Sequence, residues 1–224
     1  MHIQIYTMQT PDEARAVARL GVDHVGITPS ALGLPGEVDL STARAIVEAV
    51  RGLATIVALS VDEDLDAIEA MVRAVQPDIL HLCGEFGTVP PPAIRVLRER
   101  LPDVKIMQAI PVGGPESITD ALAYQDVADY LILDTKDAAI TGIGASGQTH
   151  DWAISRAIID AVRIPVILAG GLSPENVAEA IRAVRPWGVD SLTHTNAPLP
   201  GGGFRKDLER VREFVRAARG AADA

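Results

Sequence analysis

The chain has 224 residues, which suits one compact domain and is too short for two of that size. Hydrophobic residues make up 48% of the chain and aromatic residues only 4%, so Ala, Val, Ile and Leu must fill its core. A formal net charge of −10 disfavours nucleic acid and anionic membrane surfaces as partners. A phosphorylated small molecule remains compatible with that charge, because backbone amides can hold a phosphate locally.

The chain has one cysteine, Cys83, which excludes an intrachain disulfide and fits a reducing compartment. The first residues show no basic segment followed by an apolar stretch, as a secretory signal would have. The longest apolar runs, such as Ile164–Ala169, are too short to cross a bilayer. We therefore expect a soluble, cytoplasmic protein.

Eight short apolar segments alternate with helical patterns along the chain. Most of these segments are rich in Val, Ile or Leu, as parallel strands buried on both faces are. The expected strands are Ile3–Tyr6, His24–Ile27, Thr55–Leu59, Ile79–Leu82, Lys105–Ala109, Tyr130–Leu133, Val166–Ala169 and Val189–Leu192. This alternation predicts an α/β fold, a (β/α)8 TIM barrel.

The helical patterns carry recognisable start signals. Pro11–Arg15 opens with proline and two acids, and Ser173–Val177 opens similarly, with Ser173 as the expected cap. Asp120–Gln125 ends the fifth helix, and an amphipathic pattern predicts the last helix over Lys206–Arg219. We expect a single domain over residues 1–219 and a frayed tail over residues 220–224.

A weak internal repeat supports the barrel. Arg73–Ile79 resembles Arg182–Pro186, and both segments mark the end of a helix before a strand. Pro/Gly-rich stretches at 28–36, 84–92, 141–147 and 197–203 follow strand ends and are interpreted as loops of the active face, since no linker divides the chain.

A glycine turn follows the seventh strand. Gly170 and Gly171 precede a helix start, and glycine allows backbone amides to approach an anion closely. In these barrels the loops after strands seven and eight frequently bind phosphate, so Thr193 and His194 are expected to complete the site. The alternative is a tight turn without a ligand.

Polar side chains at strand ends are the candidate catalytic groups. Asp134 ends the sixth strand and is a candidate general acid or base, or else an acid that only caps the strand. Residues two apart share a face, so Tyr6 points with Gln4, and Cys83 points with His81. A metal site needs three or more convergent ligands, so His81 and Cys83 alone do not predict one. We expect no metal and no cofactor.

Several motifs resemble the phosphoribosylanthranilate isomerase family. They are Leu133–Thr135, Gly144–Trp152, Leu168–Val177, Gly188–Asp190 and Gly203–Leu208, and the likeness covers essentially the whole chain. The resemblance implies an Amadori rearrangement in tryptophan biosynthesis, with Asp134 as the acid that opens the sugar ring. The segment 141–149 resembles the family's glycine-rich loop, and Gly144, Ser146 and Gly147 are the expected substrate-loop residues. The expected partner is a phosphorylated small molecule, and the expected state is a monomer or a homodimer.

The chain departs from the family pattern at four places. The Lys-x-Cys-Gly motif with the family's base reads Gln4-Ile5-Tyr6-Thr7, and Gln-Leu-His-Gly reads His81-Leu82-Cys83-Gly84. The stretch 28–36 has no arginine to hold the anthranilate carboxylate, and Ser-Ser-Gly reads Leu192-Thr193-His194. A phenol, with a pKa near 10, is a poor base at neutral pH.

Three hypotheses follow from these departures. The first is an isomerase of a phosphorylated sugar derivative with a changed substrate, which uses Cys83 or His81 as its base. The second is the authentic family reaction with rearranged groups. The third is a non-catalytic barrel that binds a phosphorylated metabolite. The two enzymatic hypotheses require Asp134 and the Gly170-Gly171 turn to lie at the same open end of a barrel.

Overall fold

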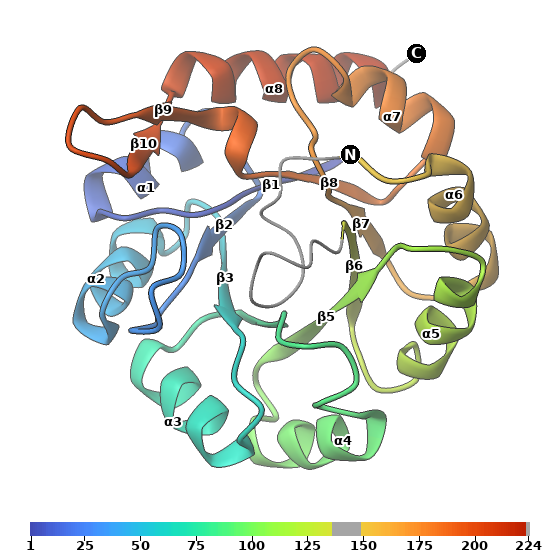
Figure 1. Cartoon of the computed structure of the whole chain (residues 1–224). Helices are drawn as coiled ribbons and strands as arrows, with labels where there is room; N and C mark the ends of the chain where they lie inside the picture. Colours follow the sequence, from blue (N-terminus) through green and yellow to red (C-terminus); the bar gives the residue numbers. More distant parts are fainter. Residues whose placement is uncertain (136–148, 223–224) are drawn as a thin grey trace.

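The computed structural model describes residues 1–135 and 149–222, and eight parallel strands close into a barrel surrounded by helices (Figure 1). The strands are β1 (His2–Ile5), β2 (His24–Ile27), β3 (Thr55–Ser60), β4 (Ile79–Leu82), β5 (Lys105–Pro111), β6 (Tyr130–Asp134), β7 (Val166–Leu168) and β8 (Gly188–Ser191). Each strand pairs with the next, and β8 pairs with β1, for example Asp190 with Gln4. The predicted (β/α)8 TIM barrel is confirmed.

The outer layer consists of eight main helices in the described part of the chain. They are α1 (Pro11–Ala18), α2 (Leu40–Val50), α3 (Leu65–Val75), α4 (Pro91–Arg100), α5 (Glu116–Tyr124), α6 (Trp152–Ala161), α7 (Val177–Val184) and α8 (Leu208–Ala222). Among the described residues, none of these helices is both long and apolar enough to cross a membrane. Thr10 caps α1 by accepting from the Glu13 amide, and Pro11 fills the first helical position, as its start signal predicts.

The start of α7 differs from the prediction. Asn176, not Ser173, occupies the N-cap position. The Ser173 hydroxyl accepts from the Glu175 amide at 3.2 Å, and the Ser173 carbonyl accepts from Val177 at 3.0 Å. Ser173 therefore begins a turn that leads into the helix, because its carbonyl accepts from the amides of both Asn176 and Val177.

The C-terminal segment also differs from the prediction. Lys206 lies in the short strand β10 (Phe204–Lys206), which pairs antiparallel with β9 (Asn196–Pro198). The last helix begins at Leu208 because the Asp207 carboxylate caps it, accepting from the Glu209 and Arg210 amides at 3.0 and 3.2 Å. Residues 220–222 belong to α8, so this part of the tail is helical rather than frayed, and residues 223–224 lie outside the described residues.

The predicted internal repeat corresponds to the same backbone conformation at the ends of two helices. Gln76 and Arg185 end α3 and α7 with positive φ angles of 57° and 54°, and each amide donates to the carbonyl four residues earlier. Both residues precede a proline, which cannot continue a helix. The same conformation thus ends both helices and directs the chain into β4 and β8.

Carboxylates fix the amino-terminal rim of the barrel at alternate strands. Asp23, Asp78 and Asp129 precede β2, β4 and β6, and each accepts a backbone N–H from the preceding strand. The donors are Ile3 at 2.8 Å, Ile56 at 2.7 Å and Ile106 at 2.9 Å. At the corresponding place before β8, Trp187 stacks on His2 with ring centroids 3.8 Å apart. This rim is therefore tied together by structural contacts, and the opposite rim carries the long loops.

The barrel interior and the outer shell form separate apolar clusters. The buried apolar side chains of the interior cluster are Tyr6, Val57, Ile79, Cys83, Met107, Ala109, Ile132, Ile167 and Ala169. A larger cluster fills the layer between strands and helices. Since residues two apart share a face, the interior cluster continues toward the carboxyl ends of the strands, where Cys83 and Asp134 stand.

Candidate active site

One pocket at the carboxyl end of the barrel brings the predicted acid and the predicted phosphate turn together. Its lining comprises Asp134, Gly170, Gly171, Leu172, Asp190, Ser191, Leu192, Thr193 and His194. The cavity measures about 20 Å³, comparable to the space that one water needs. The required convergence of Asp134 with the glycine turn at one rim is therefore met.

The glycine turn requires glycine for two reasons. Gly170 and Gly171 have φ angles of 81° and 61°, a region that side chains other than glycine rarely adopt. A Cβ added at Gly170 would lie 2.7 Å from Thr135 Oγ1 and 2.8 Å from His150 Nδ1. The backbone can therefore approach a ligand here at a distance that a larger residue would block.

The amides at the start of α7 have partners within their own turn. Asn176 and Val177 donate to the Ser173 carbonyl, at 3.2 and 3.0 Å, and Glu175 donates to the Ser173 hydroxyl. The expected contribution of a helix N-terminus to anion binding is thus reduced. An anion in this pocket would depend on the glycine turn and on the loop after β8.

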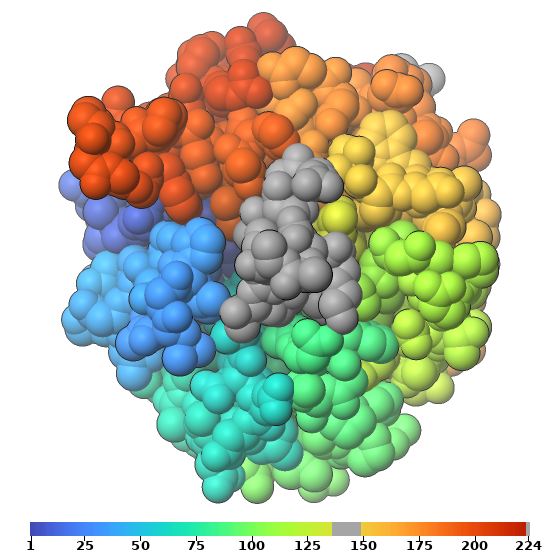
Figure 2. Space-filling view, viewed as in Figure 1, coloured from blue at the N-terminus to red at the C-terminus, as the bar shows by residue number. Residues whose placement is uncertain are grey.

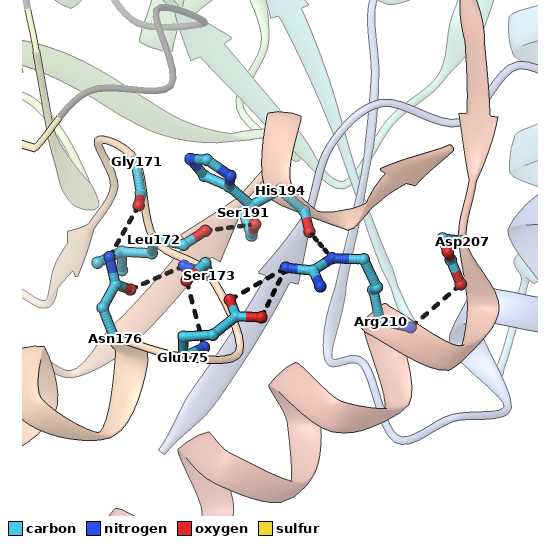
Figure 3. A network of polar contacts seen from close by, with 9 residues as sticks. All are labelled: Gly171, Leu172, Ser173, Glu175, Asn176, Ser191, His194, Asp207 and Arg210. Carbon is cyan, nitrogen blue, oxygen red and sulfur yellow. Dashed lines mark hydrogen bonds and ion pairs between the residues drawn. The ribbon is translucent and has the colours of Figure 1, made fainter. Parts of the chain in front are cut away.

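The loops after β7 and β8 are clamped to each other (Figure 3). Arg210 on α8 donates from Nε to the His194 carbonyl at 2.7 Å, and its Nη2 donates to both carboxylate oxygens of Glu175 at 3.0 and 3.1 Å. Ser191 donates to the Leu172 carbonyl at 2.8 Å, and Asn176 donates to the Gly171 carbonyl at 3.0 Å. These contacts hold the two predicted phosphate loops in one fixed arrangement, which favours binding without reorganisation.

Asp134 has the protonation behaviour of a general acid. Part of the residue stays exposed, but its carboxyl is enclosed, and this burial raises the pKa of Asp134 from 3.8 to about 7. The Thr135 amide donates to Oδ1 at 2.7 Å and opposes that rise. A group that exchanges its proton near neutral pH is suited to acid–base catalysis at that pH.

Asp190 is a second carboxyl in the same pocket, and the sequence analysis did not single it out. It is 7% exposed, and its Oδ1 has no hydrogen-bond partner among the described residues. Burial and the charge of Asp134 raise the pKa of Asp190 to about 8. An acid inside a predicted strand was the available signal, because the alternation of β8 points it inward beside Gln4.

Tyr6, His81 and Cys83 lie together in the barrel interior, and none of them lines the pocket of Asp134. Tyr6 Oη and His81 Nδ1 are 3.0 Å apart, and His81 Nε2 is buried without a partner in the described part of the chain. Burial raises the pKa of Tyr6 well above 10 and lowers the pKa of His81 to about 3. Both groups are therefore neutral at neutral pH, and both exchange protons poorly there.

Lys206 is a buried lysine that the sequence analysis placed in a helix. Its Nζ donates to the carbonyls of Tyr6 and Leu192, to Thr195 Oγ1 and to Asn196 Oδ1. It is 4% exposed, and burial lowers its pKa to about 7. The ammonium thus joins the end of β1, the loop after β8 and the β9–β10 hairpin beside the mouth.

Lys206→Met is expected to lower the free energy of unfolding by about 2–5 kcal/mol, because each buried acceptor left without a donor costs about 1–3 kcal/mol. The loss should be larger at pH 9 than at pH 7. The pKa of Lys206 is about 7 in the folded protein and has its ordinary value of 10.5 in the unfolded chain. Between these two values the unfolded chain binds more protons than the folded protein, so the wild type becomes more stable as pH rises and the variant does not. Urea unfolding measures this effect. The exposed Lys105→Met is the control and should change stability by under about 1 kcal/mol.

Two further predictions from the sequence concern a metal site and the substrate loop. Within the ranges 1–135 and 149–222, no three His, Cys, Asp or Glu side chains are grouped to hold a metal ion. The substrate-loop residues Gly144, Ser146 and Gly147 lie outside the described residues.

A closed (β/α)8 barrel with a titratable carboxyl beside a glycine turn after β7 defines the class of barrel enzymes that work at the carboxyl ends of their strands. The family model for N-(5'-phosphoribosyl)anthranilate (PRA) isomerase matches residues 3–217. A relative from Methanocella arvoryzae, named N-(5'-phosphoribosyl)anthranilate isomerase, is 36% identical over 218 residues, 97% of each chain. The chain belongs to the PRA isomerase family, and the predicted family and isomerase class are confirmed.

Solved structures agree with this assignment. The phosphoribosyl anthranilate isomerase from Thermotoga maritima has a TM-score of 0.80 at 27% identity, covering 98% of this chain and 99% of that one. A further isomerase, solved with reduced 1-(o-carboxyphenylamino)-1-deoxyribulose 5-phosphate, has a TM-score of 0.79 at 26% identity with the same coverage. The barrel of this chain thus has the same overall fold as solved enzymes of this family.

Proposed function

We propose that this chain catalyses the acid–base isomerisation of an N-linked aldose phosphate to an aminoketose phosphate. The main support for this proposal is that Asp134, whose pKa is raised to about 7, shares one pocket with the Gly170-Gly171 turn. Asp134 donates its proton to the ring oxygen as the ring C–O bond breaks, and the nitrogen lone pair forms the C=N bond. A base then removes one proton from the neighbouring carbon, and the C–H electrons form a C=C bond as the C=N electrons return to nitrogen, which gives an amino-substituted enol. The former imine carbon then takes up one proton and the enol oxygen loses one, which gives the aminoketone.

The phosphate is assigned to the clamped loops after β7 and β8. Gly170 and Gly171 offer a close backbone approach, and Thr193 and His194 line the same pocket. The net charge of −10 makes local amides, rather than a general positive field, the source of phosphate affinity. We further propose that the protein is cytoplasmic and that it is a monomer or a homodimer. It is proposed to have no nucleic-acid or membrane partner.

The base is assigned to the cluster of Tyr6, His81 and Cys83. The Tyr6 phenol keeps its proton, since burial raises its pKa, and burial leaves the His81 imidazole with little affinity for one. Cys83 is thus the strongest candidate to accept the proton, and its position in the interior cluster supports this role.

PRA itself is the second candidate substrate, because relatives at 34–36% identity carry that isomerase name. Purified protein is expected to isomerise a phosphorylated N-glycoside, and the fluorescence of PRA makes its consumption a direct assay. Complementation of a tryptophan auxotroph that lacks the isomerase would establish the authentic reaction in tryptophan biosynthesis. Binding of phosphorylated glycosides without turnover of any of them would instead favour the non-catalytic barrel.

A further inference from the structure

A second, larger pocket opens at the same end of the barrel, between the loops after β2 and β3. It measures about 370 Å³, within the usual size of small-molecule sites. Its apolar lining includes Leu32, Leu40, Leu59 and Met71. Figures 1 and 2 show the corresponding α2 and α3 segments side by side on the face that carries the barrel mouth.

Leu59 connects this pocket to the barrel interior. It lines the pocket and also packs against the cluster that contains Tyr6 and Cys83. The pocket therefore adjoins the interior cluster that includes the proposed base, whereas the phosphate turn lies at β7 and β8. A substrate whose phosphate occupies that turn would extend its other end toward β2 and β3.

The charges around the larger pocket are negative. Asp39 and Asp62 belong to its lining, which contains no Lys, Arg or His among the described residues. Hydrogen bonds from the Ser41 hydroxyl and the Thr42 amide lower the pKa of Asp39, so it stays ionised. Asp62 also lines a smaller neighbouring pocket together with Glu85. A carboxylate placed here would meet like charges, which raises the free energy of its ionised form.

The backbone amides of the β2–α2 loop are already used by a carboxylate of the chain. Glu37 accepts from the amides of Leu32, Gly33 and Leu34 at 2.9–3.0 Å. It also accepts from the Ser30 hydroxyl at 2.9 Å. Successive amides of this kind form a typical anion site, and here the side chain of the loop itself fills it. The loop is thereby ordered, and its amides are not available to a substrate anion.

Leu32 is held at the edge of the pocket by that ordered loop. It is 67% exposed, which makes it the most exposed large hydrophobic side chain in the described part of the chain. A fixed apolar side chain beside an apolar pocket favours contact with an apolar ligand group, because burying it removes apolar surface from water.

We propose that this pocket binds the nitrogen-linked group of the substrate, and that this group is apolar and carries no carboxylate. The proposal rests on the proposed isomerase function and names its substrate class: phosphoribosyl glycosides of uncharged aryl or alkyl amines. The apolar lining supplies affinity, and the acidic rim with its occupied amide site selects against an anionic group.

Two matched substrates test the proposal, the phosphoribosyl glycosides of aniline and of anthranilate, which differ by one carboxylate. The aniline derivative is expected to show a kcat/KM at least about tenfold higher, and both progress curves can be followed by absorbance. Equal or better turnover of the anthranilate derivative would overturn the pocket assignment and leave the isomerase function standing. Turnover of neither substrate would overturn the isomerase function, and the pocket assignment with it.

A charged substitution at the edge of the larger pocket provides a second test. Leu32→Arg places a guanidinium beside the pocket and is expected to shift the ratio of the two kcat/KM values toward anthranilate by about tenfold or more. The control is Leu122→Arg, the same change at a 39% exposed position on α5, which should leave the ratio unchanged. If both variants keep the wild-type ratio while remaining folded by circular dichroism, the pocket does not hold this group.

Discussion

Asp134→Asn is expected to lower kcat/KM by a factor of about 10²–10⁴, the usual contribution of a positioned general acid. The amide keeps the shape of the carboxyl but has no proton to give to the ring oxygen. The wild-type rate should fall as pH rises through about 7, where Asp134 loses its proton, and the residual activity of the variant should lack this limb. A pH–rate profile of both proteins measures the difference.

Asp134→Asn is expected to lower activity but to preserve or raise stability at pH 8. Burial raises the pKa of Asp134, so its contribution to stability is fully present below pH 3.8 and is lost as pH rises through about 7. At pH 8 the wild type carries an ionised buried carboxyl, at a cost of up to roughly 4 kcal/mol. Asp134→Asn should therefore unfold at an equal or higher urea concentration at that pH.

An exposed acid serves as the control for this pair of measurements. Asp103→Asn, in the loop before β5, should leave both the rate and the unfolding midpoint unchanged. Lost activity together with lost stability in Asp134→Asn would contradict the assignment, since it would mean that the carboxylate is a structural partner rather than an enclosed acid.

The fold follows closely from local patterns. Each parallel strand is buried on both faces, so its apolar run is visible in the sequence, and the alternation with helices restricts the topology to a barrel. The strand ends were predicted to within about two residues. The β9–β10 hairpin was not predicted, because two strands of three residues, joined by proline and glycines, show no alternation.

The site was predictable where topology alone fixes a residue. Asp134 ends β6 and Gly170 follows the neighbouring strand β7, so a closed barrel brings them to one rim. Contacts between distant segments were not predictable. The Tyr6–His81 contact spans 75 residues, and Lys206 reaches the Tyr6 carbonyl across 200 residues. A lysine before an amphipathic helix has the pattern of an exposed residue, and only packing against β1 shows that it is buried.

Cys83→Ala is expected to abolish turnover, with a loss of about 10²–10⁴ in kcat/KM, if its thiol accepts the proton from the carbon beside the imine. The neighbouring groups are poor alternatives, since Tyr6 holds its proton and His81 binds one only at acidic pH. Cys83→Ser should be nearly as inactive, because a serine hydroxyl is far less acidic than a thiol and supplies no anion to accept the proton.

Structural damage is separated from chemistry by a second readout. The Cys83 side chain is buried and small, so the alanine variant should stay folded and should bind inorganic phosphate as tightly as the wild type. Met107→Leu, a volume-conserving change in the same interior cluster, should keep near wild-type turnover. Full activity of Cys83→Ala would remove the thiol from the mechanism. The proton would then have to pass to another group at the mouth, and Asp190, with a pKa raised to about 8 and an unpartnered oxygen in the pocket of Asp134, would be the next residue to replace.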